Sequence, residues 1–70
     1  MTIGEKIKEL RETKGMSQVK LGKIMGTNNC VIYAWEKGRY EPTLFNCILL
    51  ADAFGVSLDE LACRDFKGGK

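Results

Sequence analysis

The chain has 70 residues, which is enough for one small domain and too few for two. Hydrophobic residues make up 44% of the chain and charged residues 29%, a balance typical of a globular protein rather than a disordered or fibrous one. No apolar run approaches the roughly 18 residues of a membrane span, and the charged N-terminal segment lacks the apolar stretch of a signal peptide.

The cysteines and the missing histidine exclude several kinds of site. Cys30, Cys47 and Cys63 are odd in number and widely spaced, and the chain has no histidine. Neither a disulfide framework nor a common zinc pattern fits them, so we expect no metal and no cofactor. Histidine is also the usual general base, and its absence argues against an enzyme. Free thiols are typical of a reducing compartment, so we expect a cytoplasmic protein.

The net charge of +2 is unevenly distributed. Residues 1–23 carry six basic side chains against three acidic ones, for a net charge of +3. Residues 24–41 are neutral, and residues 42–70 carry a net charge of −1. A basic first part suits an anionic partner, although a solvated helix face explains the same pattern as often.

Two short helices are predicted in the first part of the chain, each between a capping residue and a glycine. Thr2 and Glu5 have the spacing of a capping box, and Gly15 can end the helix that they start. Ser17 is a good N-cap for a second helix, which ends at Gly26. The expected core faces are Ile3, Ile7 and Leu10 on the first helix, and Leu21, Gly22 and Met25 on the second.

A third helix is predicted from Asn28, its N-cap, until Gly38 stops it. Gly22 leaves room where the second helix must approach the third closely, and Gly26 permits a sharp turn between them. Ile32 lies three residues before Trp35, so we expect both to face inward. The expected outward residues are Cys30, Tyr33, Ala34 and Lys37, with Asn29 near the exposed start of the helix.

Two more helices complete an all-α fold of five short helices, because no segment has the pattern of a strand. Thr43 can cap the fourth helix, which ends at Gly55, and Ser57 with Glu60 forms another capping box ahead of the fifth. Residues 67–70 should be frayed. The expected core face of the fourth helix is Leu44, Cys47, Ile48, Ala51 and Phe54.

Residues 17–42 resemble the helix-turn-helix of the Cro and phage-repressor (XRE-like) family of DNA-binding proteins. The likeness implies a compact, lambda-repressor-like domain over residues 1–66, with its motif at about residues 17–38 and double-stranded DNA as its partner. It covers nearly the whole chain, through Leu10-Arg11, Gly15-Met16-Ser17-Gln18, Trp35-Glu36-Lys37-Gly38 and residues 53–61.

Four residues of the third helix match family positions that commonly contact bases: Asn29, Cys30, Tyr33 and Ala34. A major groove admits one such helix, and the Asn29 amide can donate to and accept from adenine at once, with a second helix cap as the alternative. Cys30 offers a small apolar contact or a weak donor, and Tyr33 a base or phosphate contact through its hydroxyl. Ala34 offers only an apolar contact, for example with a thymine methyl.

Phosphate contacts are expected at both ends of this motif. Ser17 and Gln18 stand at the start of the second helix, where free amides and the helix dipole attract an anion, and the family residue matching Gln18 typically bonds a phosphate. Lys37 and Arg39 flank the end of the third helix, although solvation alone also explains them. The expected phosphate-contacting residues are Ser17, Gln18, Asn28, Lys37, Arg39 and Tyr40.

Arg11 and Glu36 are interpreted as structural rather than chemical residues. The resemblance implies a salt bridge between them that joins the first and third helices. Removing one partner of such a buried pair typically costs about 3–5 kcal/mol.

A dimer is expected from apolar residues on the fourth helix. Phe45 and Leu49 lie away from its expected core face, where an isolated domain would carry polar residues, although single exposed apolar residues are also common. The expected dimer interface consists of Phe45, Leu49, Val56, Leu58 and Phe66.

The sequence therefore predicts a transcriptional regulator, and specifically a repressor that binds a near-palindromic operator as a dimer. Too few residues follow the fifth helix for an effector domain, so we expect a stand-alone regulator of Cro size. The alternative is an antitoxin-like module that binds a protein partner and also its own operator.

Overall fold

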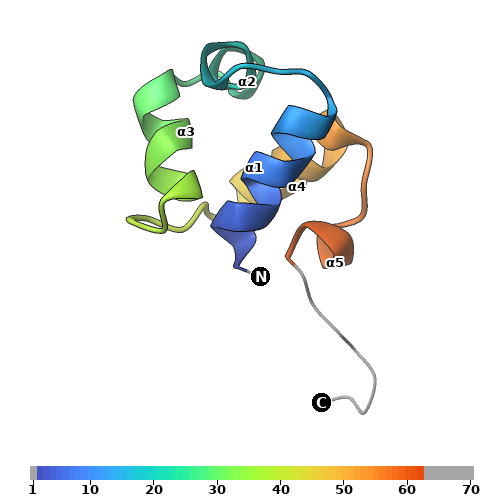
Figure 1. Ribbon diagram of the computed structural model, residues 1–70. Coiled ribbons are helices and arrows are strands. Elements are labelled where there is room, and N and C mark those ends of the chain that lie inside the picture. The colour runs from blue at the N-terminus through green and yellow to red at the C-terminus, as the bar shows by residue number, and fades with distance from the viewer. Residues whose placement is uncertain (1, 63–70) are drawn as a thin grey trace.

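The structure is a computed structural model that describes residues 2–62, and within them it is all-α (Figure 1). The expected fraying at residues 67–70, the expected domain boundary at residue 66 and Phe66 lie outside the described residues. None of the helices within residues 2–62 has the length and apolar character needed to cross a membrane. The helices are α1 (Ile3–Thr13), α2 (Gln18–Met25), α3 (Asn29–Glu36), α4 (Leu44–Phe54) and α5 (Leu58–Leu61).

Every helix begins after the N-cap that the sequence predicts. In each case a side-chain oxygen accepts a hydrogen bond from the backbone N–H three residues later, which satisfies one free amide of the first turn. The capping box of Thr2 and Glu5 is complete. Gly26 and Gly55 end α2 and α4 with φ of 75° and 72°, a left-handed conformation that favours glycine. The caps are Thr2, Ser17, Asn28, Thr43 and Ser57.

One hydrophobic core joins all five helices. α3 packs against both α1 and α2, and α4 contacts α1, α2 and α5. Figure 1 shows α2 and α3 together on one side of the molecule, with α1 passing in front of α4. The short α5 closes the core at the other end through Leu61, which is fully buried. The buried cluster is Ile7, Leu10, Leu21, Ile32, Trp35, Leu50, Ala51, Phe54 and Leu61.

The core face of α4 differs from the prediction. Leu44 is 71% exposed and Ile48 is also exposed, whereas Leu50 is fully buried. The buried stripe therefore consists of Cys47, Leu50, Ala51 and Phe54, with Cys47 only partly covered. Because α4 is apolar on nearly every side, its periodicity allows more than one stripe, and packing against α1, α2 and α5 selects this one.

Two glycines allow the helices around α3 to approach closely. A Cβ at Gly22 would lie 2.9 Å from the carbonyl carbon of Asn28, so any side chain would push α2 away from the start of α3. A Cβ at Gly4 would overlap the carbonyl oxygen of Trp35 at the end of α3. The approach at Gly22 was predicted from the sequence, and the approach at Gly4 was not.

Candidate nucleic-acid interface

A buried ion pair fixes α3 against α1. Arg11 Nε lies 2.6 Å from Glu36 Oε2, and Arg11 Nη2 lies 3.2 Å from Glu36 Oε1. The guanidinium therefore donates two hydrogen bonds to the carboxylate. The two side chains are only 10% and 3% exposed. The hydrogen bond to Glu36 raises the pKa of Arg11 above its ordinary value, against the opposing effect of burial. The structure thus confirms the expected pair.

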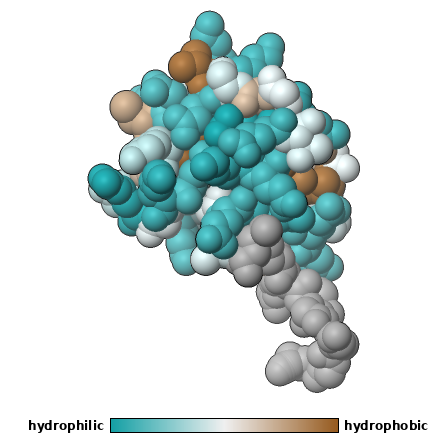
Figure 2. Space-filling view, in the orientation of Figure 1, coloured by the Kyte–Doolittle hydropathy of each residue, from teal (hydrophilic) through white to brown (hydrophobic). Residues whose placement is uncertain are grey.

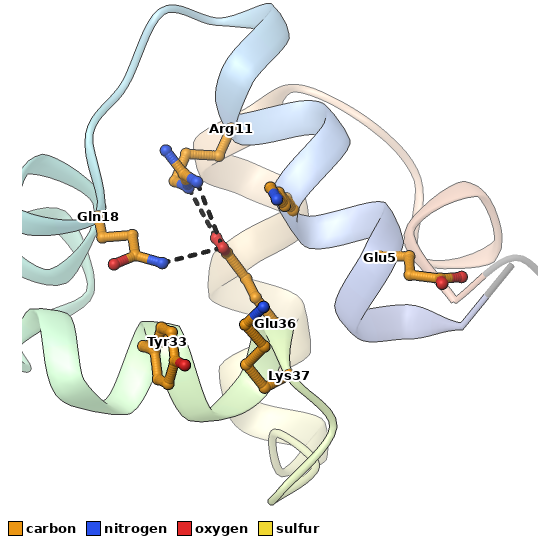
Figure 3. A pocket seen from close by; sticks show the side chains of 7 residues that line it. Glu5, Arg11, Gln18, Tyr33, Glu36 and Lys37 are labelled. Atoms are coloured by element: carbon orange, nitrogen blue, oxygen red, sulfur yellow. Dashed lines mark hydrogen bonds and ion pairs between the residues drawn. The ribbon is translucent and has the colours of Figure 1, made fainter.

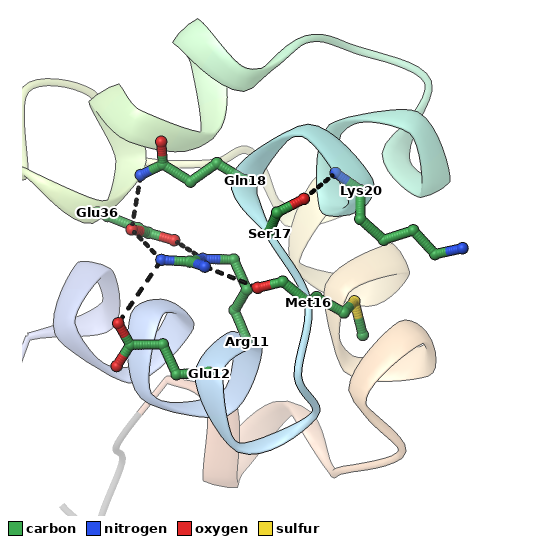
Figure 4. A network of polar contacts seen from close by, with 7 residues as sticks. All are labelled: Arg11, Glu12, Met16, Ser17, Gln18, Lys20 and Glu36. Carbon is green, nitrogen blue, oxygen red and sulfur yellow. Dashed lines mark hydrogen bonds and ion pairs between the residues drawn. The ribbon is translucent and has the colours of Figure 1, made fainter.

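The same carboxylate also holds the start of α2, as Figure 4 shows. Gln18 Nε2 donates to Glu36 Oε1 at 3.1 Å, and Arg11 Nη1 donates to the carbonyl oxygen of Met16 at 2.7 Å. α1, α2 and α3 therefore meet at one network. The bond from Gln18 to Glu36 was not predicted from the sequence, and the expected phosphate contact of Gln18 stays a prediction.

The exposed start of α3 carries three of the four expected base-contacting residues. Asn29, Cys30 and Tyr33 are exposed, while Ile32 and Trp35 are buried as predicted. Asn28 is exposed as well, and its Oδ1 accepts from Val31 N at 3.1 Å as the helix cap. These side chains form an exposed surface of α3 and its N-cap.

Ala34 does not belong to this surface. Its residue exposure is 9%, so the prediction that it points outward to a base is wrong. The physical reason is that its neighbours in the fold cover this position of α3, and a methyl group is too short to extend past them. A longer side chain at this position would be needed to reach the surface.

The basic residues gather where α3 ends. Lys37 and Arg39 are exposed, and both lie beside the ring of Tyr33. Tyr40 follows and is exposed as well. A groove of about 590 Å³ runs from this cluster towards α1, and Figure 3 shows the side chains around it. Its walls are Glu5, Lys8, Arg11, Gln18, Tyr33, Glu36 and Lys37.

Figure 2 shows one face of the molecule, in the orientation of Figure 1, on which strongly hydrophobic residues appear only in small, separate spots. At the start of α2, Ser17 is exposed, and its hydroxyl accepts from Lys20 N at 3.0 Å. The interface candidate therefore combines a helix N-terminus, polar side chains and cations, which is the mixture that DNA backbones and base edges require.

The expected dimer residues are only partly gathered on the surface. Phe45 and Leu58 are exposed, but Leu49 is partly covered and Val56 packs against the core. The reason is the different orientation of α4, which turns Leu44 outward beside Phe45.

The two cysteines among the described residues are free thiols. Cys30 is exposed on α3, whereas Cys47 lies against the core and its Sγ is 3.9 Å from the carbonyl oxygen of Pro42. Burial, with a smaller contribution from Glu41, raises the pKa of the Cys47 thiol. Cys47 is therefore a packing residue, and only Cys30 belongs to the interface candidate.

Comparisons with known proteins agree with this geometry. A helix-turn-helix family model matches residues 7–61. An uncharacterized HTH-type transcriptional regulator of Bacillus subtilis, YgzD, is 38% identical over 56 residues, which are 80% of this chain and 85% of that protein. Repressor protein C2 of Salmonella phage P22 is 36% identical over 63 residues, which are 90% of this chain and 29% of that protein. The crystal structure of the P22 c2 repressor in complex with synthetic operator 9T has a TM-score of 0.85 and 34% identity, over 93% of this chain and 98% of that one.

The arrangement of α2, the turn at Gly26 and α3 defines a helix-turn-helix DNA-binding domain. The chain belongs to the helix-turn-helix family, and within it to the transcriptional regulators of the Cro and phage-repressor (XRE-like) type. This class is one of DNA-binding transcriptional regulators.

Proposed function

We propose that this protein binds a near-palindromic operator in double-stranded DNA as a dimer and represses transcription by covering a promoter in the cytoplasm. The observation that carries the proposal is the exposed, polar start of α3, held in a fixed orientation by the buried pair of Arg11 and Glu36. A helix fixed in this way can enter a major groove as a rigid element. The relation to the P22 repressor, whose structure was solved with an operator, supports the same conclusion.

In this proposal, α3 reads the bases. Asn29 pairs with adenine through its amide, and Cys30 makes a small apolar contact beside it. The Tyr33 hydroxyl reaches a base edge or a phosphate. No arginine lies on the exposed face of α3, so we expect weak selection for guanine at the positions that this helix reads.

The backbone contacts surround this reading surface. Ser17 and Gln18 offer free amides at the start of α2, where the helix dipole attracts a phosphate. The Gln18 side-chain NH2 group has two N–H donors, and one of them bonds Glu36, so its second N–H and its backbone amide are the donors proposed for a phosphate. The other proposed phosphate-contacting residues are Asn28, Lys37, Arg39 and Tyr40.

The dimer places two copies of α3 about 34 Å apart, one turn of DNA, in successive major grooves. Phe45 and Leu58, which are exposed, supply apolar contact between the copies. Leu49 and Val56 are partly buried, and they contribute only the parts of their side chains that remain exposed. So few exposed apolar side chains favour association on DNA over a stable free dimer.

Selection of bound sequences from a random pool of duplexes at physiological salt tests the function. We expect an enriched inverted repeat whose half-site centres are about 10 base pairs apart. Two chains per duplex in sedimentation would show the dimer, and transcription in vitro from a promoter overlapping the site should fall when the protein is added. A pool that shows no enrichment after repeated rounds would remove the proposal, and binding that appears only with a second protein would favour the antitoxin-like alternative.

A further inference from the structure

The ring of Tyr33 lies beside two cations, one at the end of α3 and one just after it. Lys37 Nζ is 5.6 Å from the ring centroid and Arg39 Cζ is 5.8 Å from it. Both distances fall within the roughly 6 Å over which a cation is attracted to the face of an aromatic ring. Figure 3 shows Tyr33 and Lys37 projecting from the same side of α3.

The backbone at the end of α3 brings these three residues together. Lys37 is the C-cap of α3 and follows Tyr33 by four residues, so the two side chains share a helix face. Gly38 then turns the chain with φ of 76°, and Arg39 N donates back to the carbonyl oxygen of Ala34 at 3.0 Å. This hydrogen bond ties the backbone of Arg39 to Ala34 in α3, although Arg39 lies beyond the end of the helix.

Contact with the ring leaves the cations able to bind an anion. An ammonium or guanidinium group over an aromatic ring uses its face or one edge, and its other N–H donors still point outward. Long basic side chains lose considerable rotamer freedom when a phosphate immobilises them. A ring that already restricts them removes part of this loss before the DNA arrives.

We propose that Tyr33 is a positioning residue, whose ring holds Lys37 and Arg39 in the orientation in which they bind the DNA backbone. This inference rests on the proposed DNA binding and assigns the ring of Tyr33 a role separate from any contact of its hydroxyl. Tyr33 is 42% exposed, so the ring contributes little to the core and is available for this role.

The test is a cycle of variants measured on a random-sequence duplex at low salt, where base reading does not contribute. Tyr33→Leu should weaken binding about two- to tenfold for each side chain released. Tyr33→Phe keeps the ring and removes only the hydroxyl, so it should retain most of the wild-type affinity. In a Lys37→Ala/Arg39→Ala background, Tyr33→Leu should weaken binding no more than Tyr33→Phe does, because no cation remains to be positioned and both variants lack the hydroxyl.

A second measurement needs no DNA. In the NMR spectrum of the free protein, the ring current should shift the Lys37 ε-protons and the Arg39 δ-protons away from their values in an unstructured peptide. Tyr33→Leu should abolish both shifts and Tyr33→Phe should keep them.

Several outcomes would overturn the inference while leaving DNA binding intact. These are wild-type affinity in Tyr33→Leu, an equal loss in Tyr33→Phe, an equal loss in the background that lacks both cations, or unshifted protons in the wild type. A wild-type protein that binds no duplex would overturn both this inference and the proposed function.

Discussion

Replacing Gly4 with alanine should destabilise the fold, because α3 lies against Gly4, although alanine favours a helix more than glycine does. In an unobstructed helix, replacing glycine with alanine stabilises by about 0.8–1 kcal/mol. At Gly4 the new Cβ would overlap the carbonyl oxygen of Trp35 and lie 2.9 Å from that of Glu36. Overpacking of this kind typically costs about 1–3 kcal/mol and occasionally more.

The obstacle at Gly4 is backbone, which has no flexible end that could move aside. The Trp35 carbonyl also accepts from Gly38 N at 3.1 Å, so displacing it disturbs the end of α3. We therefore expect Gly4→Ala to lose about 2 kcal/mol net, which in a domain of this size lowers Tm by roughly 8–16 °C.

Thermal and urea unfolding followed by circular dichroism would measure this loss, and the fluorescence of Trp35, the single tryptophan, would report on the contact itself. Thr13→Ala is the matched control, because Thr13 is an exposed residue of α1 and alanine there should stabilise slightly. A Gly4→Ala protein with a Tm equal to or above that of the wild type would refute the close approach of α1 to α3.

Three further predictions concern the ion pair, the reading surface and a thiol. Arg11→Met should destabilise by about 3–5 kcal/mol in urea unfolding because it leaves the Glu36 carboxylate buried and unpaired, whereas Arg11→Met combined with Glu36→Leu should recover much of that loss; losses that simply add would argue against a coupled pair. Asn29→Ala should relax selection at one operator position in a binding-site selection, whereas Lys37→Ala should weaken binding to all sequences and reduce the salt slope by about one; the reverse result would contradict the assigned roles. Because burial raises the pKa of Cys47, its thiolate forms only at higher pH than an unperturbed thiol, so alkylation of Cys47 followed by mass spectrometry should rise later with pH in the folded protein than in urea; coincident pH profiles would contradict the shift.

The helix boundaries were predictable because their signals are local. A capping side chain such as Asn28 bonds an amide three residues away, and a glycine such as Gly26 is required by the φ of its own residue. The pair of Arg11 and Glu36 came instead from the family resemblance. It is 25 residues apart in sequence, and no local pattern marks it.

The errors occurred where tertiary packing decides. In α4, an almost wholly apolar helix, the sequence could not indicate that Leu50 rather than Ile48 faces the core. The burial of Ala34 depends on how closely α3 seats against its neighbours, and the bond from Gln18 to Glu36 depends on the relative placement of two helices. Gly4 carries no signal of its own, because its need for space comes from Trp35, which is distant in the chain.

The division of α3 into two faces has an evolutionary consequence. Ile32 and Trp35 anchor the helix in the core, while Asn29 and Cys30 lie on its exposed start and are absent from the buried cluster. A domain of 70 residues has a small free energy of unfolding, so it tolerates substitutions best where they leave Ile32 and Trp35 in place. In the proposed function, substitutions at Asn29 and Cys30 can therefore change the preferred operator while the buried residues that hold α3 in place are kept.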